Sequence, residues 1–157
     1  MPTLPLVLLA SIIGTVALLS IAWKARSMGL WVLTMLALTY PIGKSLQALV
    51  VGPQWVRHYL SDAGFVPFMV LSWMIGLSWL QRRGGATERG PLWAVPATLC
   101  FLALGLAGEA VQWMMGTGDW IDAACEVASA VGTAALARNI ESAFRASPEG
   151  VRSPSGR

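Results

Sequence analysis

The chain alternates long apolar stretches with short polar connections. Five stretches approach the roughly 20 residues of helix that cross a bilayer core about 30 Å thick. Their apolar residues run in continuous blocks, without the amphipathic spacing of a water-soluble helix. The pattern predicts an all-α membrane protein, a bundle of about five transmembrane helices. We expect these helices at residues 4–23, 30–51, 64–80, 92–115 and 120–137.

The connections are too short to separate domains, so residues 1–146 are predicted to form a single transmembrane helical domain. Residues 147–157 consist mostly of Ser, Pro, Gly and Arg, which is typical of a disordered tail. The first apolar stretch lacks the preceding basic segment and the cleavage site of a signal peptide. We therefore expect it to be retained as a spanning helix.

Composition supports a membrane location. Only 12% of the residues are charged and 55% are hydrophobic, whereas soluble domains carry about 25% charged residues. The eight tryptophans fit helices that cross the membrane interface, where Trp is enriched. The net charge of +3 does not indicate a nucleic-acid partner, because the basic residues stand at the ends of apolar blocks.

These basic residues predict an orientation. Nine of the eleven Lys and Arg residues follow the first, third or fifth apolar stretch. Only Arg57, in the connection between the second and third stretches, and Lys44, inside the second stretch, depart from this pattern. Because cytoplasmic connections are enriched in Lys and Arg, we expect the N-terminus outside and the C-terminus in the cytoplasm. The predicted location is the bacterial cytoplasmic membrane, which the chain crosses several times.

Polar residues are predicted to gather near the outer face. The connection 52–64 is expected to be an outer loop containing Arg57, His58 and Asp62, with one or two turns of interfacial helix. It is either an ordinary wet loop or part of a functional site. Lys44 lies roughly 9 Å below the outer boundary, where it could snorkel to the interface or pair with a carboxylate.

The fourth and fifth predicted helices carry acidic residues near the outer face, at about the depth predicted for Lys44. Glu109 and Gln112 are three residues apart, so they share one helical face. On the fifth helix, Asp122 and Glu126 belong to a polar stripe that runs on to Thr133. A helix start explains an acid such as Asp122, but it does not explain Glu126. We predict a polar pocket, open to the outside, lined by Lys44, Glu109, Gln112, Asp122 and Glu126.

No cofactor or metal is expected. Cys100 and Cys125 lie inside apolar segments, and we predict that both are buried as small hydrophobic side chains. No metal-ligand spacing is present in the sequence. No nucleophile motif accompanies the single histidine, His58. The sequence assigns no catalytic residue and favours a function other than catalysis.

Residues 102–136 resemble the VanZ-like family of small bacterial membrane proteins. The resemblance rests on the acid-x-x-Gln step at Glu109 and Gln112, a short glycine turn, and a helix with Asp122, Glu126 and Gly132. The founding member of that family is associated with resistance to the glycopeptide teicoplanin. The resemblance implies a cell-envelope protein whose outer pocket binds a lipid-linked or glycopeptide-like ligand.

Other functions stay open. Buried ionisable residues and the Pro41/Gly43 interruption would suit a small proton-coupled transporter, and the charges could also only lock helix packing. The expected partners are the lipid bilayer and a small-molecule ligand, and homo-oligomerisation is left open. The ligand-binding candidates are Lys44, Arg57, His58, Asp62, Glu109, Gln112, Asp122 and Glu126.

Overall fold

The computed structural model describes residues 9, 12–17, 20, 28–83 and 90–146, and no strand occurs within these ranges. The all-helical class predicted from the sequence is confirmed. The helix predicted at 4–23 lies outside the described residues except at 9, 12–17 and 20, which are helical, and the predicted tail 147–157 lies wholly outside them. The four long helices are α2 (Met28–Leu49), α3 (Gln54–Arg83), α4 (Ala94–Met114) and α5 (Trp120–Ala146).

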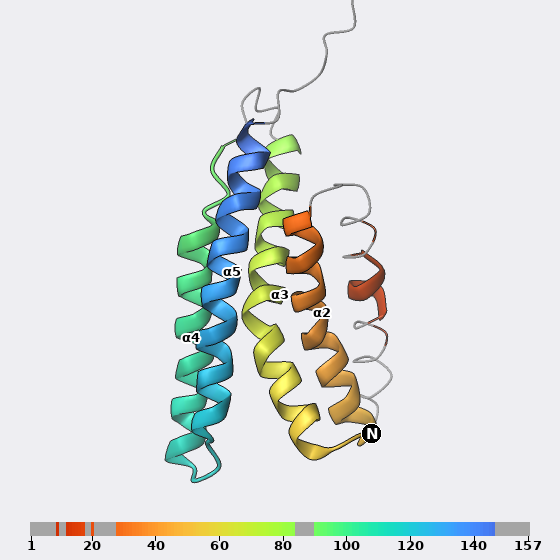
Figure 1. Cartoon of the computed structure of the whole chain (residues 1–157), viewed down its shortest axis with the longest axis vertical. Helices are drawn as coiled ribbons and strands as arrows, with labels where there is room; N and C mark the ends of the chain where they lie inside the picture. Colours follow the sequence, from red (N-terminus) through yellow and green to blue (C-terminus); the bar gives the residue numbers. More distant parts are fainter. Residues whose placement is uncertain (1–8, 10–11, 18–19, 21–27, 84–89, 147–157) are drawn as a thin grey trace, which may run out of the picture.

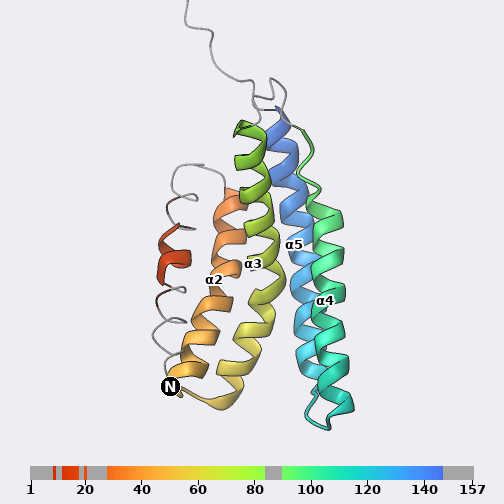
Figure 2. The same ribbon diagram turned by 180° about the vertical axis from the view of Figure 1, so that it is seen from behind.

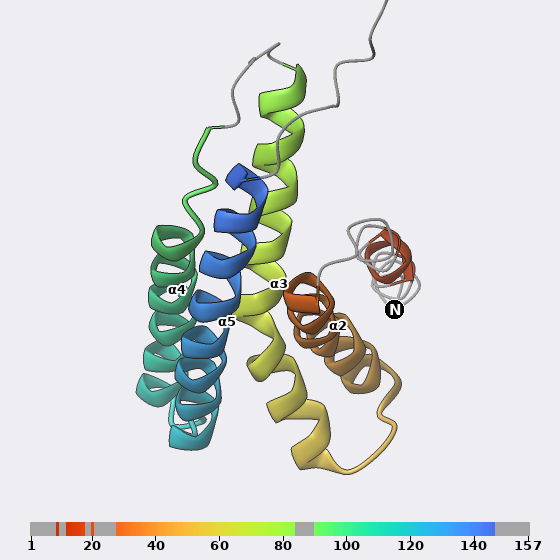
Figure 3. The same cartoon turned by 45° about the horizontal axis from the view of Figure 1, so that its top comes forward.

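The four helices form two antiparallel hairpins, α2–α3 and α4–α5 (Figure 1). Helix α3 packs against the other three, and α5 contacts α2 as well as α3 and α4. In the view from behind and in the tilted view, α2 and α4 remain on opposite sides of the α3–α5 pair (Figures 2 and 3). The connections at residues 50–53 and 115–119 lie at the same end of the bundle (bottom of Figure 1), which we call the hairpin end.

Three of the described helices are long and apolar enough to cross a membrane: Gln54–Gln81, Ala94–Met114 and Trp120–Ser142. In each of these helices, only 22–33% of the most apolar 18-residue stretch is buried inside the protein. Most of its apolar surface therefore faces outward, as expected for helices surrounded by lipid. Helix α2 is 22 residues long but is not among them. Its second half carries Tyr40, Pro41, Lys44 and Gln47, which lower its hydropathy.

Two predicted helix limits differ from the observed ones by nine or ten residues. Helix α3 begins at Gln54, ten residues before the predicted start at 64, so the segment expected as an outer loop is helical. Ser61 in this segment is fully buried, and Tyr59 and Asp62 are half-buried, whereas Gln54 and His58 are exposed. Helix α5 continues to Ala146, nine residues beyond the predicted end, because charge ends a membrane-spanning stretch without ending a helix. Helices α2 and α4 agree with their predicted limits to within two residues.

Helices α2 and α3 cross at two glycines. A Cβ atom on Gly43 would lie 2.6 Å from the Ser61 nitrogen, and one on Gly64 would overlap Tyr40 and Thr39. Small residues allow membrane helices to approach this closely. The crossing holds the hairpin-end half of α3 firmly against α2, which positions the polar residues of both helices.

Helix α2 ends in a backbone motif that normally uses glycine. Val51 N–H donates to the Leu46 carbonyl at 3.1 Å, and Val50 N–H donates to the Gln47 carbonyl at 3.3 Å. This is the Schellman pattern, whose second-last residue takes a left-handed conformation. Val50 adopts it with φ 55°, whereas α4 ends in the same way at Gly116, with φ 75°. A β-branched residue is strained there.

Candidate functional site

Five carboxyl groups gather toward the hairpin end, and we call them the acidic cluster. Asp62 comes from α3, Glu109 from α4, Asp119 from the connection before α5, and Asp122 and Glu126 from α5. The charges of Asp62, Glu109 and Asp122 all act on Glu126. Folding therefore brings the predicted acids together from three helices, including Asp62, which the sequence places in the outer connection 52–64.

Glu126 is the deepest member of this cluster by burial. Its side chain is only 4% exposed, and its Oε2 atom has no hydrogen-bond partner among the described residues. The carboxyl group packs on α4 at Gly105, where an added Cβ would lie 2.7 Å from Glu126 Cδ. The missing side chain of Gly105 thus provides the space that the Glu126 carboxyl group occupies.

Glu109 is also buried, with 6% exposure. Gln112 Nε2 donates to Glu109 Oε1 at 3.0 Å, so the predicted pairing of these residues across one helical turn is present. Glu109 Oε2 has no donor in the described part of the chain. Each buried glutamate therefore retains an acceptor oxygen that no described protein group satisfies.

Asp62 and Asp122 form a contact between α3 and α5. Their carboxyl groups lie within hydrogen-bonding distance of one another. Two carboxylate ions offer acceptors only, so this hydrogen bond requires a proton on one of them. When both are ionised, Asp122 Oδ1 is buried without a donor among the described residues.

Asp119 differs from the other members because both of its oxygens have donors. The Tyr59 hydroxyl donates to Oδ2 at 3.0 Å, and Ile121 N–H donates to Oδ1 at 3.0 Å. The second bond is an N-cap of α5, and the first ties the α4–α5 connection to α3. Asp119 therefore has a structural explanation.

The basic candidates lie around the cluster. Lys44 Nζ donates to Gln47 Oε1 at 3.4 Å and stands 5.7 Å from the Tyr40 ring centroid. Its charge acts on Asp62, so the structure places it near that acid. His58 is exposed, and its charge acts on Asp122. The Arg57 side chain lies outside the described part of the structure.

A small cavity of about 330 Å³ adjoins the α4–α5 connection, lined by Trp113, Gly116, Gly118 and Trp120. A Cβ on Gly118 would lie 2.6 Å from Trp113 Cγ, so the absence of a side chain there lets the indole ring pack against the backbone. This cavity brings two exposed aromatic rings to the end of the bundle that carries the acidic cluster.

Sequence analysis did not identify several residues of this region. Tyr59 and Gly105 act through contacts between helices, and no spacing within one helix reveals such contacts. Ser61 is fully buried with a hydroxyl oxygen that lacks a partner among the described residues, and the same holds for Thr133, which the sequence did place in the polar stripe. The prediction that Cys100 is buried is wrong, since its side chain is exposed. In a membrane helix, an apolar position can face lipid as easily as the bundle interior.

The acids of this site are not arranged as metal ligands. Within the described ranges, no group of three or more His, Cys, Asp or Glu side chains could hold a metal ion. Comparison with known proteins finds no match: no protein-family model, curated protein or solved structure is similar to this chain.

Proposed function

We propose that the chain is a VanZ-like protein of the bacterial cytoplasmic membrane with about five spans. In this proposal, α2 and residues 4–23 supply two spans beside the three described ones. The N-terminus and the hairpin end face outward, and the basic residues at the opposite end face the cytoplasm. This assignment is supported by the distribution of Lys and Arg along the sequence.

In the proposed function, the acidic cluster binds the donor-rich head group of a lipid-linked or glycopeptide-like ligand. The observation that carries the proposal is the pair of unsatisfied oxygens on Glu109 and Glu126, which are 6% and 4% exposed. A buried acceptor or charge without a partner costs a few kcal/mol. Amine or hydroxyl groups of a ligand would remove that cost.

The cavity between Trp113 and Trp120 supports the same kind of ligand. Indole rings attract cations over their faces, and they are enriched at the membrane interface. A head group that entered from the outer leaflet would meet these rings beside carboxylates. Both features suit an amine-bearing or polyhydroxylated group better than an anionic one.

The proposal can be tested in a bacterial strain from which the gene for this chain has been deleted. We expect the strain to lose tolerance to a glycopeptide antibiotic and to regain it with the wild-type gene. Glu109→Gln and Glu126→Gln, which keep size but remove charge, should not restore tolerance at equal membrane abundance. Ser142→Ala, at an exposed position near the other end of the same helix, is the control and should restore it. Full restoration by both Gln variants would refute the ligand site and favour a role in helix packing.

A second function, proton-coupled transport, is favoured by one observation. Asp62 and Asp122 are in contact between α3 and α5, and in this alternative the pair binds the transported proton. Proton flux into liposomes containing the purified protein would support transport if Asp62→Asn abolished it. Flux equal to that of empty liposomes would exclude this alternative without affecting the proposed ligand-binding function.

A further inference from the structure

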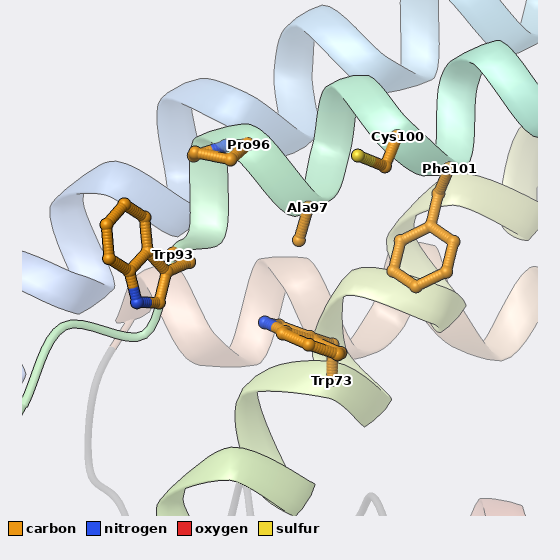
Figure 4. Close-up of a pocket in the computed structure, with 6 residues that line it drawn as sticks. All are labelled: Trp73, Trp93, Pro96, Ala97, Cys100 and Phe101. Carbon is orange, nitrogen blue, oxygen red and sulfur yellow. The ribbon is translucent and has the colours of Figure 1, made fainter.

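A second candidate site lies between α3 and α4, away from the acidic cluster. A cavity of about 300 Å³ is lined only by apolar side-chain surfaces (Figure 4). Its walls belong to two candidate membrane spans and the residue that precedes the second, so lipid would surround the cavity once these helices cross a membrane. The lining residues are Trp73, Trp93, Pro96, Ala97, Cys100 and Phe101. We call this cavity the apolar groove.

Hydrogen bonds fix the walls of the apolar groove. Trp73 Nε1 donates to the Leu92 carbonyl at 3.0 Å, which orients the indole ring. Leu92 N–H and Ala94 N–H donate to the two carboxylate oxygens of Glu141 on α5, at 2.9 and 3.2 Å. These bonds hold Trp93 between them in a left-handed conformation, with φ 54° and ψ 36°. The groove is therefore preformed, so an occupant pays little to order it.

An exposed stripe of α3 leads from the groove to a positive charge. Trp73, Gly76, Leu80 and Arg83 follow one another at steps of three, four and three residues, so they lie along one face of the helix. All four are exposed, and Gly76 leaves open space where a side chain would stand. Ten residues of helix place Arg83 about 15 Å beyond Trp73.

The end of this stripe has the chemistry of a phosphate site. The Arg83 guanidinium lies 4.1 Å from the centroid of the Trp79 ring, which orients it at the end of α3. A guanidinium forms paired hydrogen bonds with phosphate oxygens. The distance of about 15 Å between Arg83 and Trp73 is half the thickness of a bilayer core. A lipid of one leaflet with its head group at Arg83 would therefore have an acyl chain long enough to reach Trp73.

We propose that the apolar groove and Arg83 bind one anionic phospholipid. One acyl chain lies along Gly76 and Leu80 and enters the groove at Trp73, while the phosphate contacts Arg83. A zwitterionic lipid would bring its own cation close to Arg83, so the site prefers a net negative head group. The site lies at the end opposite the acidic cluster, and it does not depend on the ligand proposed there.

The test uses the full chain in nanodiscs made from equal parts of phosphatidylglycerol and phosphatidylcholine. After extraction into detergent, native mass spectrometry counts the lipids that remain bound. We expect wild type to retain phosphatidylglycerol preferentially, and Arg83→Gln to lower this preference about fivefold, the effect of one basic residue at an anionic surface. Arg83→Lys should keep part of it.

A matched pair of variants tests the groove. Cys100→Phe places a ring in the groove and should reduce the number of retained lipids. Leu99→Phe adds the same ring at the neighbouring residue, which is 62% exposed and does not line the groove, and it should leave retention unchanged. In a Cys125→Ala background, phosphatidylglycerol should slow maleimide labelling of Cys100 relative to phosphatidylcholine, without any change in the groove itself.

Three results would overturn the proposal. Equal retention of the two lipids by wild type would remove the preference for negative charge. Equal effects of Cys100→Phe and Leu99→Phe, together with unprotected Cys100, would show that no chain occupies the groove. A dimer in wild type that Cys100→Phe dissociates would show that the groove binds a second copy of the protein instead.

Discussion

The carboxyl group of Glu126 on α5 packs against α4 at Gly105, where any other residue would place an atom inside its contact distance. Glu126 is not at a helix end, where a carboxylate would favour the helix dipole, and Gly105 is not at a turn, where glycine would be needed for its backbone conformation. Each explains the other: the acid requires space between two helices, and the glycine supplies it. Such a pairing suits a site more than a general packing device, because an apolar side chain would fill the same space without an unsatisfied oxygen.

Gly105→Ala should therefore destabilise the protein by about 1–3 kcal/mol, the usual cost of an overpacked interior. Gly108→Ala is the control, since a Cβ there meets no atom within 4 Å and alanine favours a helix by up to about 1 kcal/mol. Thermal unfolding in detergent would compare the two. Adding Glu126→Ala should remove most of the cost of Gly105→Ala, as expected for residues in contact. Equal stability of the two alanine variants would contradict the prediction.

Much of this arrangement could be predicted from the sequence. Apolar blocks predicted α2 and α4 to within two residues, and helical periodicity predicted that Glu109 and Gln112 share a face. The start of α3 could not be predicted, because the buried polar face at Ser61 has the composition of a loop. Polarity in a membrane helix indicates a protein-facing surface as readily as a wet connection.

The contacts between helices were not predictable in the same way. Periodicity gives the direction in which Glu126 points along its own helix, but the relative rotation and height of α4 decide that Gly105 is opposite. The same applies to Tyr59, whose partner Asp119 lies 60 residues away in the chain. Lys44 is a further example. Its position along α2 could be predicted from the sequence, whereas its position near Asp62 depends on how α2 crosses α3.

Tyr59→Phe should lower stability, because it removes the hydrogen bond that the Tyr59 hydroxyl donates to the Asp119 carboxylate. Asp119→Ala should cost more, since it also removes the N-cap of α5, worth about 1 kcal/mol. The two changes together should cost less than the sum of the single changes. Thermal unfolding of the four proteins of this cycle would measure the coupling, and strictly additive effects would show that the hydrogen bond contributes nothing.

Val50→Gly should stabilise the protein. A non-glycine residue in the left-handed region costs about 1–2 kcal/mol, and the greater freedom of glycine in the unfolded chain offsets about 0.5–1 kcal/mol of that gain. We expect a net increase of about 0.5–1 kcal/mol in the free energy of unfolding. Gly116→Val, at the equivalent position after α4, should have the opposite sign. The prediction fails if Val50→Gly destabilises the protein.

Glu141→Gln should loosen the start of α4. The Glu141 carboxylate accepts hydrogen bonds from Leu92 N–H and Ala94 N–H, and an amide provides one acceptor oxygen in place of two. Hydrogen exchange at these two amides should become faster, while exchange in the middle of α4 stays unchanged. Asn139→Ala, at an exposed position on the same helix, is the control. Unchanged exchange in Glu141→Gln would show that other groups hold this segment.

The Asp62–Asp122 contact predicts how stability responds to pH. The hydrogen bond requires a proton, so raising the pH removes it and leaves two negative charges in contact. The positive charges of Lys44 and His58 oppose this repulsion, and the negative charges of Glu109 and Asp119 add to it. Wild type should therefore lose stability as the pH rises. In Asp62→Asn, the amide donates permanently to Asp122, so this loss should shrink and the variant should be the more stable one at high pH. Thermal unfolding across a pH series measures both curves, and parallel curves would show that no shared proton joins α3 to α5.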